Sequence, residues 1–390
     1  MRRLRSLWLR SLQLRSLRLR SRPVLIGAAL AALAIIVVGA LLLGGSGARP
    51  PSPPPSAPPS PTLSPLPSPT PSPTPPTPAG VCPLTGEPVF VQELAQRPAL
   101  LVQIENHPEA RPAAGLSRAD LVIEAPVEGD TTRFAAVYMC QPDVGAVGPV
   151  RSGRYFNVDL WQQLRALTMH FGAGFEVLQA FDTAGMPYVN GLTGMWPQFA
   201  RSGDRPAPHN VYLDLKAVRA AIAEGGALAD LAERSGETRA PFVFDAKARL
   251  PPGTGVGSVT IQTNEFWRFA WTYDVASGRW ERSDAGERIV DPMTAEPVSA
   301  RSVMVQIVAE EVLFGELDAG GFPRRRQYLV GTGDGVLYFD GASHPVRWER
   351  ATAGDVTSWF FAESGEPVIL PPGQVWWEIV PIGTAISESP

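Results

Sequence analysis

Hydrophobic and polar positions divide the chain into three kinds of sequence. Residues 24–43 are twenty apolar residues without a charge, and a helix of that length matches the roughly 30 Å core of a bilayer. Residues 44–80 are rich in Pro, and from residue 81 onward short apolar runs alternate with polar turns. The pattern predicts a membrane segment, an extended linker and a folded body.

The first half of the body, residues 81–238, mixes strand-like runs with helical periodicity. Apolar residues recur every three or four positions in the helical stretches. We therefore expect an N-terminal mixed α/β layered domain. The predicted strands are 98–105, 119–126 and 133–140, and the predicted helices are 155–167, 175–183 and 214–234.

The second half, residues 239–390, has almost no helical periodicity and predicts a mainly antiparallel β domain, a barrel or a sandwich. The whole body is thus expected to be α+β. Seven of the ten Trp fall in this half, and we expect them to pack between strands; an exposed row that stacks on sugars is the alternative. The predicted strands are 256–263, 266–274, 279–283, 302–309, 326–330, 335–339, 345–349, 357–361 and 375–380, with a hairpin turn at 275–278.

Charge orients the N-terminal segments. Residues 1–23 contain eight Arg and no acid, which keeps this basic segment cytoplasmic and places the body outside the membrane as a single-pass protein. The alternative is a cleaved signal peptide, since Ser46-Gly47-Ala48 has small residues at a suitable spacing. Residues 50–79 contain 16 Pro, which predicts an extended polyproline II stalk.

The body is acidic and carries two cysteines. Residues 50–390 hold 25 basic and 38 acidic residues, a balance that argues against nucleic-acid binding. Cys82 and Cys140 both lie in the exported body, where an oxidising compartment favours a disulfide. Two reduced, buried thiols are the alternative.

Polar residues concentrate between 105 and 210, at strand ends and in Gly/Pro loops, where sites are usually built. Arg151 and Arg154 flank Ser152, and two guanidinium groups at that spacing suit a carboxylate or a phosphate. We expect a pocket of Arg133, Arg151, Arg154 and His209, with Arg201 and Arg205 as possible additions and with Asp120, Glu124 and Glu128 orienting the guanidinium groups. Structural salt bridges are the alternative. The full set of candidate ligand-binding residues is Asn106, His107, Arg111, Glu124, Glu128, Arg133, Arg151, Ser152, Arg154, His170, His209 and Asn210.

Three other interpretations of these residues, two catalytic and one metal-binding, have less support in the sequence than anion binding. Glu124 and Glu128 could serve as acid and base for cleavage of a wall glycan or peptide, if they face each other. His107, His170 and His209 match no compact metal motif. Ser152 lacks the Gly-x-Ser-x-Gly elbow. We therefore expect no cofactor and no metal, and we favour a binding protein over an enzyme.

Several motifs resemble the exported YerB-like lipoprotein family over about residues 81–385. The matching segments are Asn106-His107-Pro108, Thr132-Arg133-Phe134, Gly148-Pro149-Val150-Arg151-Ser152 and Pro208-His209-Asn210. The resemblance implies a two-part domain of unknown function in an extracytoplasmic compartment, and it implies no activity. One departure is that the lipidated Cys of such relatives is missing, because Cys82 lies 39 residues beyond the apolar run.

Together these patterns predict a membrane-tethered, extracytoplasmic protein of the cell envelope. We expect its N-terminal domain to bind an anionic wall component or an envelope partner protein, and we expect no nucleic-acid partner.

Overall fold

The computed structural model describes residues 77–264 and 267–390, which belong to one of two compact units of the chain, Pro73–Pro390. The basic segment, the apolar run 24–43 and the Pro-rich stalk up to residue 76 lie outside the described residues. Among the described residues, no helix is both long enough and apolar enough to cross a membrane.

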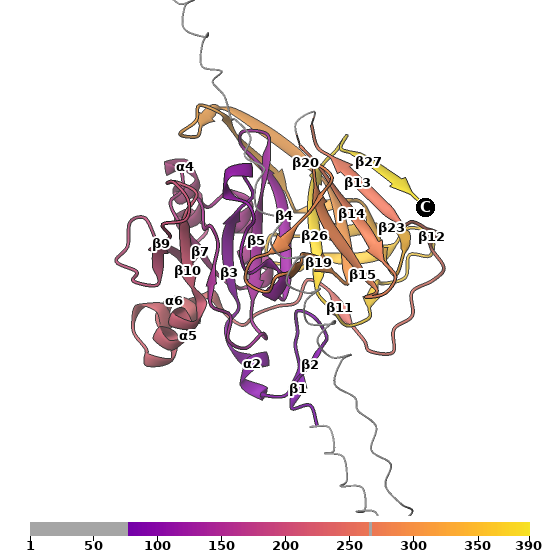
Figure 1. The fold of residues 1–390 in the computed structure, drawn as a ribbon, viewed down its shortest axis with the longest axis horizontal. Helices are drawn as coiled ribbons and strands as arrows, with labels where there is room; N and C mark the ends of the chain where they lie inside the picture. The colour runs from indigo at the N-terminus through magenta and orange to yellow at the C-terminus, as the bar shows by residue number, and fades with distance from the viewer. Residues whose placement is uncertain (1–76, 265–266) are drawn as a thin grey trace, which may run out of the picture. The chain divides into compact units, whose positions relative to one another are not determined.

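A twelve-stranded mixed sheet forms the centre of the described fold (Figure 1). Its strand order is β12-β23-β22-β20-β26-β4-β5-β3-β7-β8, with β21 added beside β20 and β24 beside β23. The strands are β12 (Thr254–Gly255), β23 (Ala342–Arg350), β22 (Gly331–Phe339), β20 (Ser302–Leu317), β26 (Val375–Pro381), β4 (Leu121–Val127), β5 (Thr131–Tyr138), β3 (Leu100–Glu105), β7 (Leu167–His170), β8 (Tyr188–Asn190), β21 (Pro323–Tyr328) and β24 (Ser358–Phe361).

Strand β26 joins the two halves of the body. It pairs in parallel with β20 on one side and with β4 on the other, as Figure 1 shows. Trp376 and Trp377 are both fully buried, and they point to opposite faces because side chains alternate along a strand. Strands from both sides of the expected boundary near residue 238 therefore share one sheet and one core.

A six-stranded antiparallel sheet packs on this central sheet. Trp271 of the smaller sheet meets Trp376 edge-to-face at 5.0 Å between ring centroids, and Trp280 meets Tyr338 at 5.6 Å. All seven Trp of the second half are buried, so the packing expectation is confirmed and no exposed Trp row forms. The strands are β16 (Glu287–Arg288), β15 (Arg279–Asp284), β14 (Arg268–Asp274), β13 (Ser258–Gln262), β27 (Ala385–Ser389) and β19 (Ser299–Ala300).

The helices follow the sequence pattern with one break. Helix α4 (Phe175–Thr183) lies where it was predicted, whereas α3 (Phe156–Leu164) ends three residues before the predicted end, because Arg165 is left-handed and Leu167 begins β7. The predicted helix 214–234 is instead two helices, α5 (Leu215–Glu224) and α6 (Ala227–Ser235). Gly225 and Gly226 both have positive φ, 91° and 85°, and this backbone ends a right-handed helix.

Short elements complete the described part of the chain. They are the helix α2 (Gln92–Gln96), the 3₁₀ turns η1 (Pro108–Ala110) and η2 (Leu116–Arg118), the three-stranded sheet β6 (Ala146–Val147), β10 (Val211–Asp214) and β9 (Phe199–Arg201), and the strand pairs β1 (Gly80–Val81) with β2 (Pro88–Val89), β11 (Val243–Phe244) with β25 (Ile369–Leu370) and β17 (Val290–Asp291) with β18 (Glu296–Pro297). Strands predominate over helices, so the fold is α+β in the coarse sense expected.

The predicted disulfide is confirmed. Cys82 and Cys140 are bonded, with Cα atoms 5.9 Å apart, and they link the start of the body to the segment after β5. Because the Cys82 sulfur forms this bond, it is not free to carry a lipid.

Candidate functional site

An open cleft of about 770 Å³ brings together seven of the twelve predicted site residues. Its walls come from loops of the first half and from the tip of the β20–β21 hairpin of the second half. The predicted residues in it are His107, Glu128, Arg133, Arg151, Ser152, Arg154 and His209, and the further charged residues are Glu105, Glu109, Arg201, Asp318 and Arg324.

Strand ends place these side chains at one edge of the sheet. Glu105 ends β3 and lies directly opposite Arg133 of β5 in the antiparallel register. The loop 148–154 then crosses this edge, because the backbone N–H of Arg151 donates to the Gln103 carbonyl at 2.8 Å. Gly148 begins the loop with a φ of +148°, and a Cβ there would lie 2.8 Å from the Val211 carbonyl oxygen, so only glycine suits this position.

Two of the cleft guanidinium groups share one carboxylate. Arg154 donates from Nε to Glu128, and Arg324 of β21 donates from Nη1 to the other oxygen of Glu128 at 3.2 Å. Burial lowers the pKa of Arg154, and attraction to Glu128 partly offsets that effect. Arg324 reaches the cleft beside Gly174, where a Cβ would collide with its guanidinium group. The second half of the body therefore completes the cleft through Arg324.

A chain of charged contacts crosses the opposite side of the cleft. The Nε of Arg151 lies 2.9 Å from one oxygen of Glu105 and forms an ion pair with it, but the geometry does not meet that of a hydrogen bond. The other Glu105 oxygen lies 3.0 Å from Nδ1 of His209, whose Nε2 lies 3.1 Å from Glu109. The His107 ring stacks on His209 with centroids 5.0 Å apart.

Arg133 differs from Arg151, Arg154 and Arg324 because it has no carboxylate within ion-pair distance. Its side chain is buried, with only 5% of the residue exposed, and it forms no ion pair with any described carboxylate within 4.0 Å. Its Nη1 donates to the Ser152 carbonyl at 3.1 Å, and its Nε has no hydrogen-bond partner. Burial lowers the pKa of Arg133 well below its usual value, repulsion from Arg154 and Arg151 adds to that effect, and attraction to Glu105 and Glu128 offsets part of it.

Three predicted site residues lie outside the cleft, in a buried cluster around Arg282 of β15. Glu124 accepts a hydrogen bond from Arg282 at 2.9 Å and from Asn106 at 3.2 Å. Arg111 pairs with Asp284 at 3.2 Å. Asn106, Arg111 and Glu124 therefore do not line the cleft: β4 directs Glu124 toward the second sheet, and Glu124 lies opposite Glu378 of β26.

Three more polar residues form hydrogen bonds within the fold and do not line the cleft. His170 is fully buried, with Nδ1 2.8 Å from the Gly172 carbonyl, and burial lowers its pKa to about 4. Asn210 ties its own loop together by bonding to Arg201 and to the Ser202 carbonyl. Asp120 binds the backbone N–H groups beside the disulfide, so it orients none of the cleft guanidinium groups.

The arrangement expected for an acid–base hydrolase is not formed. Both oxygens of Glu128 are occupied by guanidinium groups, and Glu124 lies in the separate Arg282 cluster. The three-histidine metal alternative also fails, because His170 is buried behind the cleft wall and does not line the cleft.

Sequence reasoning missed several cleft residues. Glu105 and Glu109 flank the predicted His107, so their closeness in sequence was a usable signal. Arg324 begins a run of three Arg in the second half, and nothing local connects that run to the first half. Arg205, a suggested addition, instead donates to the Ala110 and Pro112 carbonyls.

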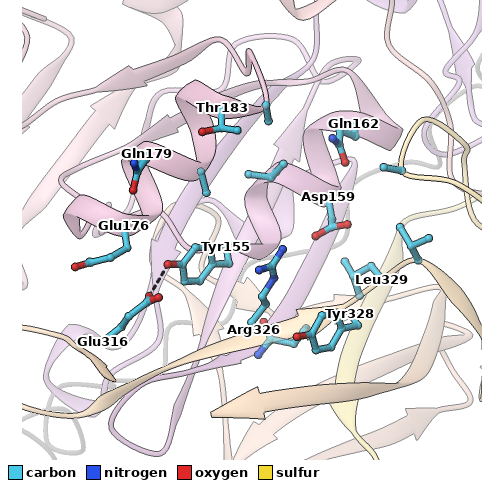
Figure 2. A pocket seen from close by; sticks show the side chains of 16 residues that line it. Tyr155, Asp159, Gln162, Glu176, Gln179, Thr183, Glu316, Arg326, Tyr328 and Leu329 are labelled. Carbon is cyan, nitrogen blue, oxygen red and sulfur yellow. Dashed lines mark hydrogen bonds between the residues drawn. The ribbon is translucent and has the colours of Figure 1, made fainter. Parts of the chain in front are cut away.

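A second cavity, of about 650 Å³, lies between helices α3 and α4 and the β20–β21 hairpin (Figure 2). The Tyr155 hydroxyl donates to Glu316 at its entrance, and the Arg326 guanidinium lies 5.7 Å from the ring centroids of both Tyr155 and Tyr328. Glu176 lines this cavity and lies 3.7 Å from Arg324 of the first cleft. The two cavities therefore share a wall.

The fold and cleft define a two-part protein whose halves share a sheet and whose polar cleft uses residues of both. Two family models match the chain, together over more than half of it: "Protein of unknown function (DUF3048) N-terminal domain" at residues 84–227 and the corresponding C-terminal domain at 258–377. The chain belongs to this family. The resemblance read from the motifs is thereby confirmed.

YerB of Bacillus subtilis is similar to this chain in both sequence and structure. The chain is 29% identical over 310 residues to "Putative lipoprotein YerB" of Bacillus subtilis (strain 168), a match that covers 79% of this chain and 88% of the relative. The crystal structure of the YerB protein from Bacillus subtilis superposes with a TM-score of 0.65 at 28% identity, covering 79% of this chain and 99% of the solved one.

Proposed function

We propose that the protein is a membrane-tethered, extracytoplasmic cell-envelope protein whose cleft binds an anionic group of the cell wall. The ligand class is a carboxylate or a phosphate. We favour binding over catalysis because Glu128 is paired with two guanidinium groups and Glu124 lies in the Arg282 cluster, so these two carboxylates do not face each other as glycan cleavage needs.

Arg133 carries this proposal. A buried cation without a direct ion-pair partner is costly, because burial removes its hydration and no carboxylate contact replaces it. Arg133 lies in the cleft wall with Arg151 and Arg154, whose positive charges repel it, while Glu105 and Glu128 attract it from beyond ion-pair distance. An anion in the cleft would offset both penalties and would accept paired hydrogen bonds from planar guanidinium groups.

The wider electrostatics of the cleft support an anionic ligand. The cleft is lined by five Arg and four acidic residues, whereas residues 50–390 as a whole carry 25 basic and 38 acidic residues. Ala173 and Gly174, the two residues before helix α4, also line the cleft, and the N-terminus of a helix attracts negative charge.

Tethering outside the membrane rests on sequence and on the relative. The basic residues 1–23 followed by the apolar residues 24–43 favour a cytoplasmic N-terminus and an exported body. The name of the Bacillus subtilis relative describes a lipoprotein. Lipoproteins are held at the membrane by a covalently attached lipid instead of an apolar segment. The disulfide fits an oxidising compartment.

Co-sedimentation with purified wall sacculi tests the proposal. Full-length protein in detergent micelles is mixed with sacculi, beside Arg133→Met and beside Arg234→Met, a control at an exposed position on α6. We expect salt-sensitive binding by the wild type and by the control, and its loss in Arg133→Met, because screening weakens charge pairing.

Sacculi stripped of anionic polymers separate the two sources of the anion. Binding that disappears with the polymers assigns a phosphate, and binding that persists assigns a peptide carboxylate. Equal binding by wild type and Arg133→Met, or no binding by either, would refute the proposed function.

A further inference from the structure

We propose that His107, Glu109 and His209 form a binding site for a divalent transition-metal ion at the rim of the cleft. One ligand atom from each residue lies within 4.8 Å of the others. Glu109 Oε2 and His209 Nε2 are 3.1 Å apart, close to the roughly 3.3 Å that separates two ligands of a tetrahedral ion with bonds near 2.0 Å. The site lies in the same cleft as the proposed anion site, but the inference does not rest on anion binding.

Glu105 provides the support that metal-binding histidines require. It lies 3.0 Å from Nδ1 of His209, on the side of the ring away from Glu109. Such a carboxylate fixes the tautomer and orientation of a metal-bound imidazole, so that the other nitrogen presents a lone pair. Arg151 contacts the second oxygen of Glu105 at 2.9 Å and holds the carboxylate in place.

The two loops that carry the ligands are fastened together. Arg205, four residues before His209, donates to the Ala110 carbonyl at 2.7 Å and to the Pro112 carbonyl at 2.9 Å. The ring of His107 stacks on that of His209. An ion would therefore meet ligands that are already held close to each other, and binding would not require the loops to fold.

The contacts of the two rings leave room for an ion. Both nitrogens of His209 face carboxylate oxygens, and a metal would take the position of a proton between Nε2 and Glu109. The one hydrogen bond of the His107 ring is accepted by Nδ1 from the Glu109 N–H at 3.2 Å, so coordination would disturb at most that bond. The Glu109 side chain is 69% exposed, which leaves the site open to solvent and to the cleft.

The donor set selects the class of ion. Two imidazoles and a carboxylate with an open position suit Zn²⁺ and neighbouring transition metals better than Mg²⁺ or Ca²⁺, which prefer oxygen ligands. The other two histidines, His170 and His344, are buried, and both cysteines are in the disulfide. Competing zinc ligands are therefore scarce in the described part of the chain.

Equilibrium dialysis against Zn²⁺ tests the site. Tag-free, full-length protein is dialysed and its metal content is measured by atomic emission, beside His107→Ala, Glu109→Gln and the control Glu224→Gln. Glu224 is exposed at the end of α5. We expect one Zn²⁺ per chain in the wild type and the control, with affinity lowered about tenfold or more when a ligand is removed. Co²⁺ should give the intense visible absorption of a tetrahedral complex in the wild type and the control, and in neither ligand variant.

The variants keep the test decisive because they lie at the surface. His107 and Glu109 are not part of the buried core, so their replacement should leave the unfolding transition unchanged. Equal zinc content in the wild type and in a His107→Ala/Glu109→Gln double variant would overturn the proposal, as would wild type without bound zinc. Neither result would bear on anion binding by Arg133.

Discussion

Arg133 donates from Nη1 to the carbonyl oxygen of Ser152 at 3.1 Å, so a carbonyl dipole holds this buried cation where a carboxylate would be expected. Its neighbour Arg154 is ion-paired with Glu128. Replacing a paired cation strands its carboxylate, whereas replacing an unpaired one strands nothing. Two Arg of the same cleft should therefore respond oppositely to the same substitution.

Arg154→Met should destabilise the protein by about 3–5 kcal/mol, because it leaves Glu128 buried with only Arg324 as its partner. The free energy of unfolding from urea titration measures this loss. Arg154→Lys should recover part of it, because it keeps a positive charge beside Glu128. An Arg154→Lys variant as unstable as Arg154→Met would show that the loss comes from packing and not from charge.

Asp120 should make stability depend on pH. Burial raises its pKa from 3.8 to about 6, even though backbone N–H groups of Met139 and Cys140 bind the charged form. The folded state then holds the proton more tightly than the unfolded state, so this contribution is complete below the unfolded pKa and is lost as pH rises through the folded one. The loss amounts to about 3 kcal/mol.

Urea unfolding of wild type and Asp120→Asn at several pH values isolates this contribution. Wild type should lose stability relative to Asp120→Asn between about pH 4 and 6, and the difference should be constant above that range. A difference that does not change with pH would contradict the raised pKa.

Glu378 should tolerate neutralisation where Arg282 does not. Arg282 contacts three carboxylates, those of Glu124, Asp284 and Glu378, and burial raises the pKa of Glu378 well above its usual value. Glu378→Gln should therefore keep or increase stability at neutral pH. Arg282→Met should lose about 3–5 kcal/mol, because three buried acids lose their common partner. Thermal unfolding of both variants, compared with wild type, checks this order; a Glu378→Gln variant that loses stability at neutral pH would show that Glu378 is ionised in the folded state.

Removing the disulfide should lower stability without changing the fold. The bond closes a separation of 58 residues, and the chain-entropy estimate for such a loop is about 4 kcal/mol. Cys82→Ala/Cys140→Ala should shift the urea midpoint accordingly, while its far-ultraviolet circular dichroism remains that of wild type. An unchanged midpoint would mean that packing around the start of the body already fixes this segment.

The sequence could predict features that depend on neighbouring residues. The helix 175–183 and the loop 148–154 follow from local periodicity and from Gly and Pro, and the loop placed Arg151 and Arg154 correctly in a cleft. The sequence could not separate Glu124 from Glu128, because their surroundings depend on how β4 pairs with β26 and packs on β15. The register that sets Glu124 opposite Glu378 joins strands from the two halves of the body.

The same limit explains the other differences. Arg324 enters the cleft from the β20–β21 hairpin, and His170 is hidden by packing against Phe181 at 5.6 Å between ring centroids. Both positions depend on contacts between residues that are distant in the sequence or that meet only in the folded chain. The Arg and His residues in the loops of the sequence indicated that a binding cleft exists. Which of these residues line the cleft is decided by contacts between segments that are distant in the sequence.

The most direct test measures wall binding and unfolding on the same preparation of Arg133→Met. Because Arg133 has no acidic partner to strand, its replacement should leave the free energy of unfolding unchanged or higher, while binding to sacculi falls about tenfold or more through loss of a buried charge-assisted contact. A variant that unfolds more easily by several kcal/mol, yet still binds sacculi as wild type does, would show that Arg133 serves the fold and would contradict the account.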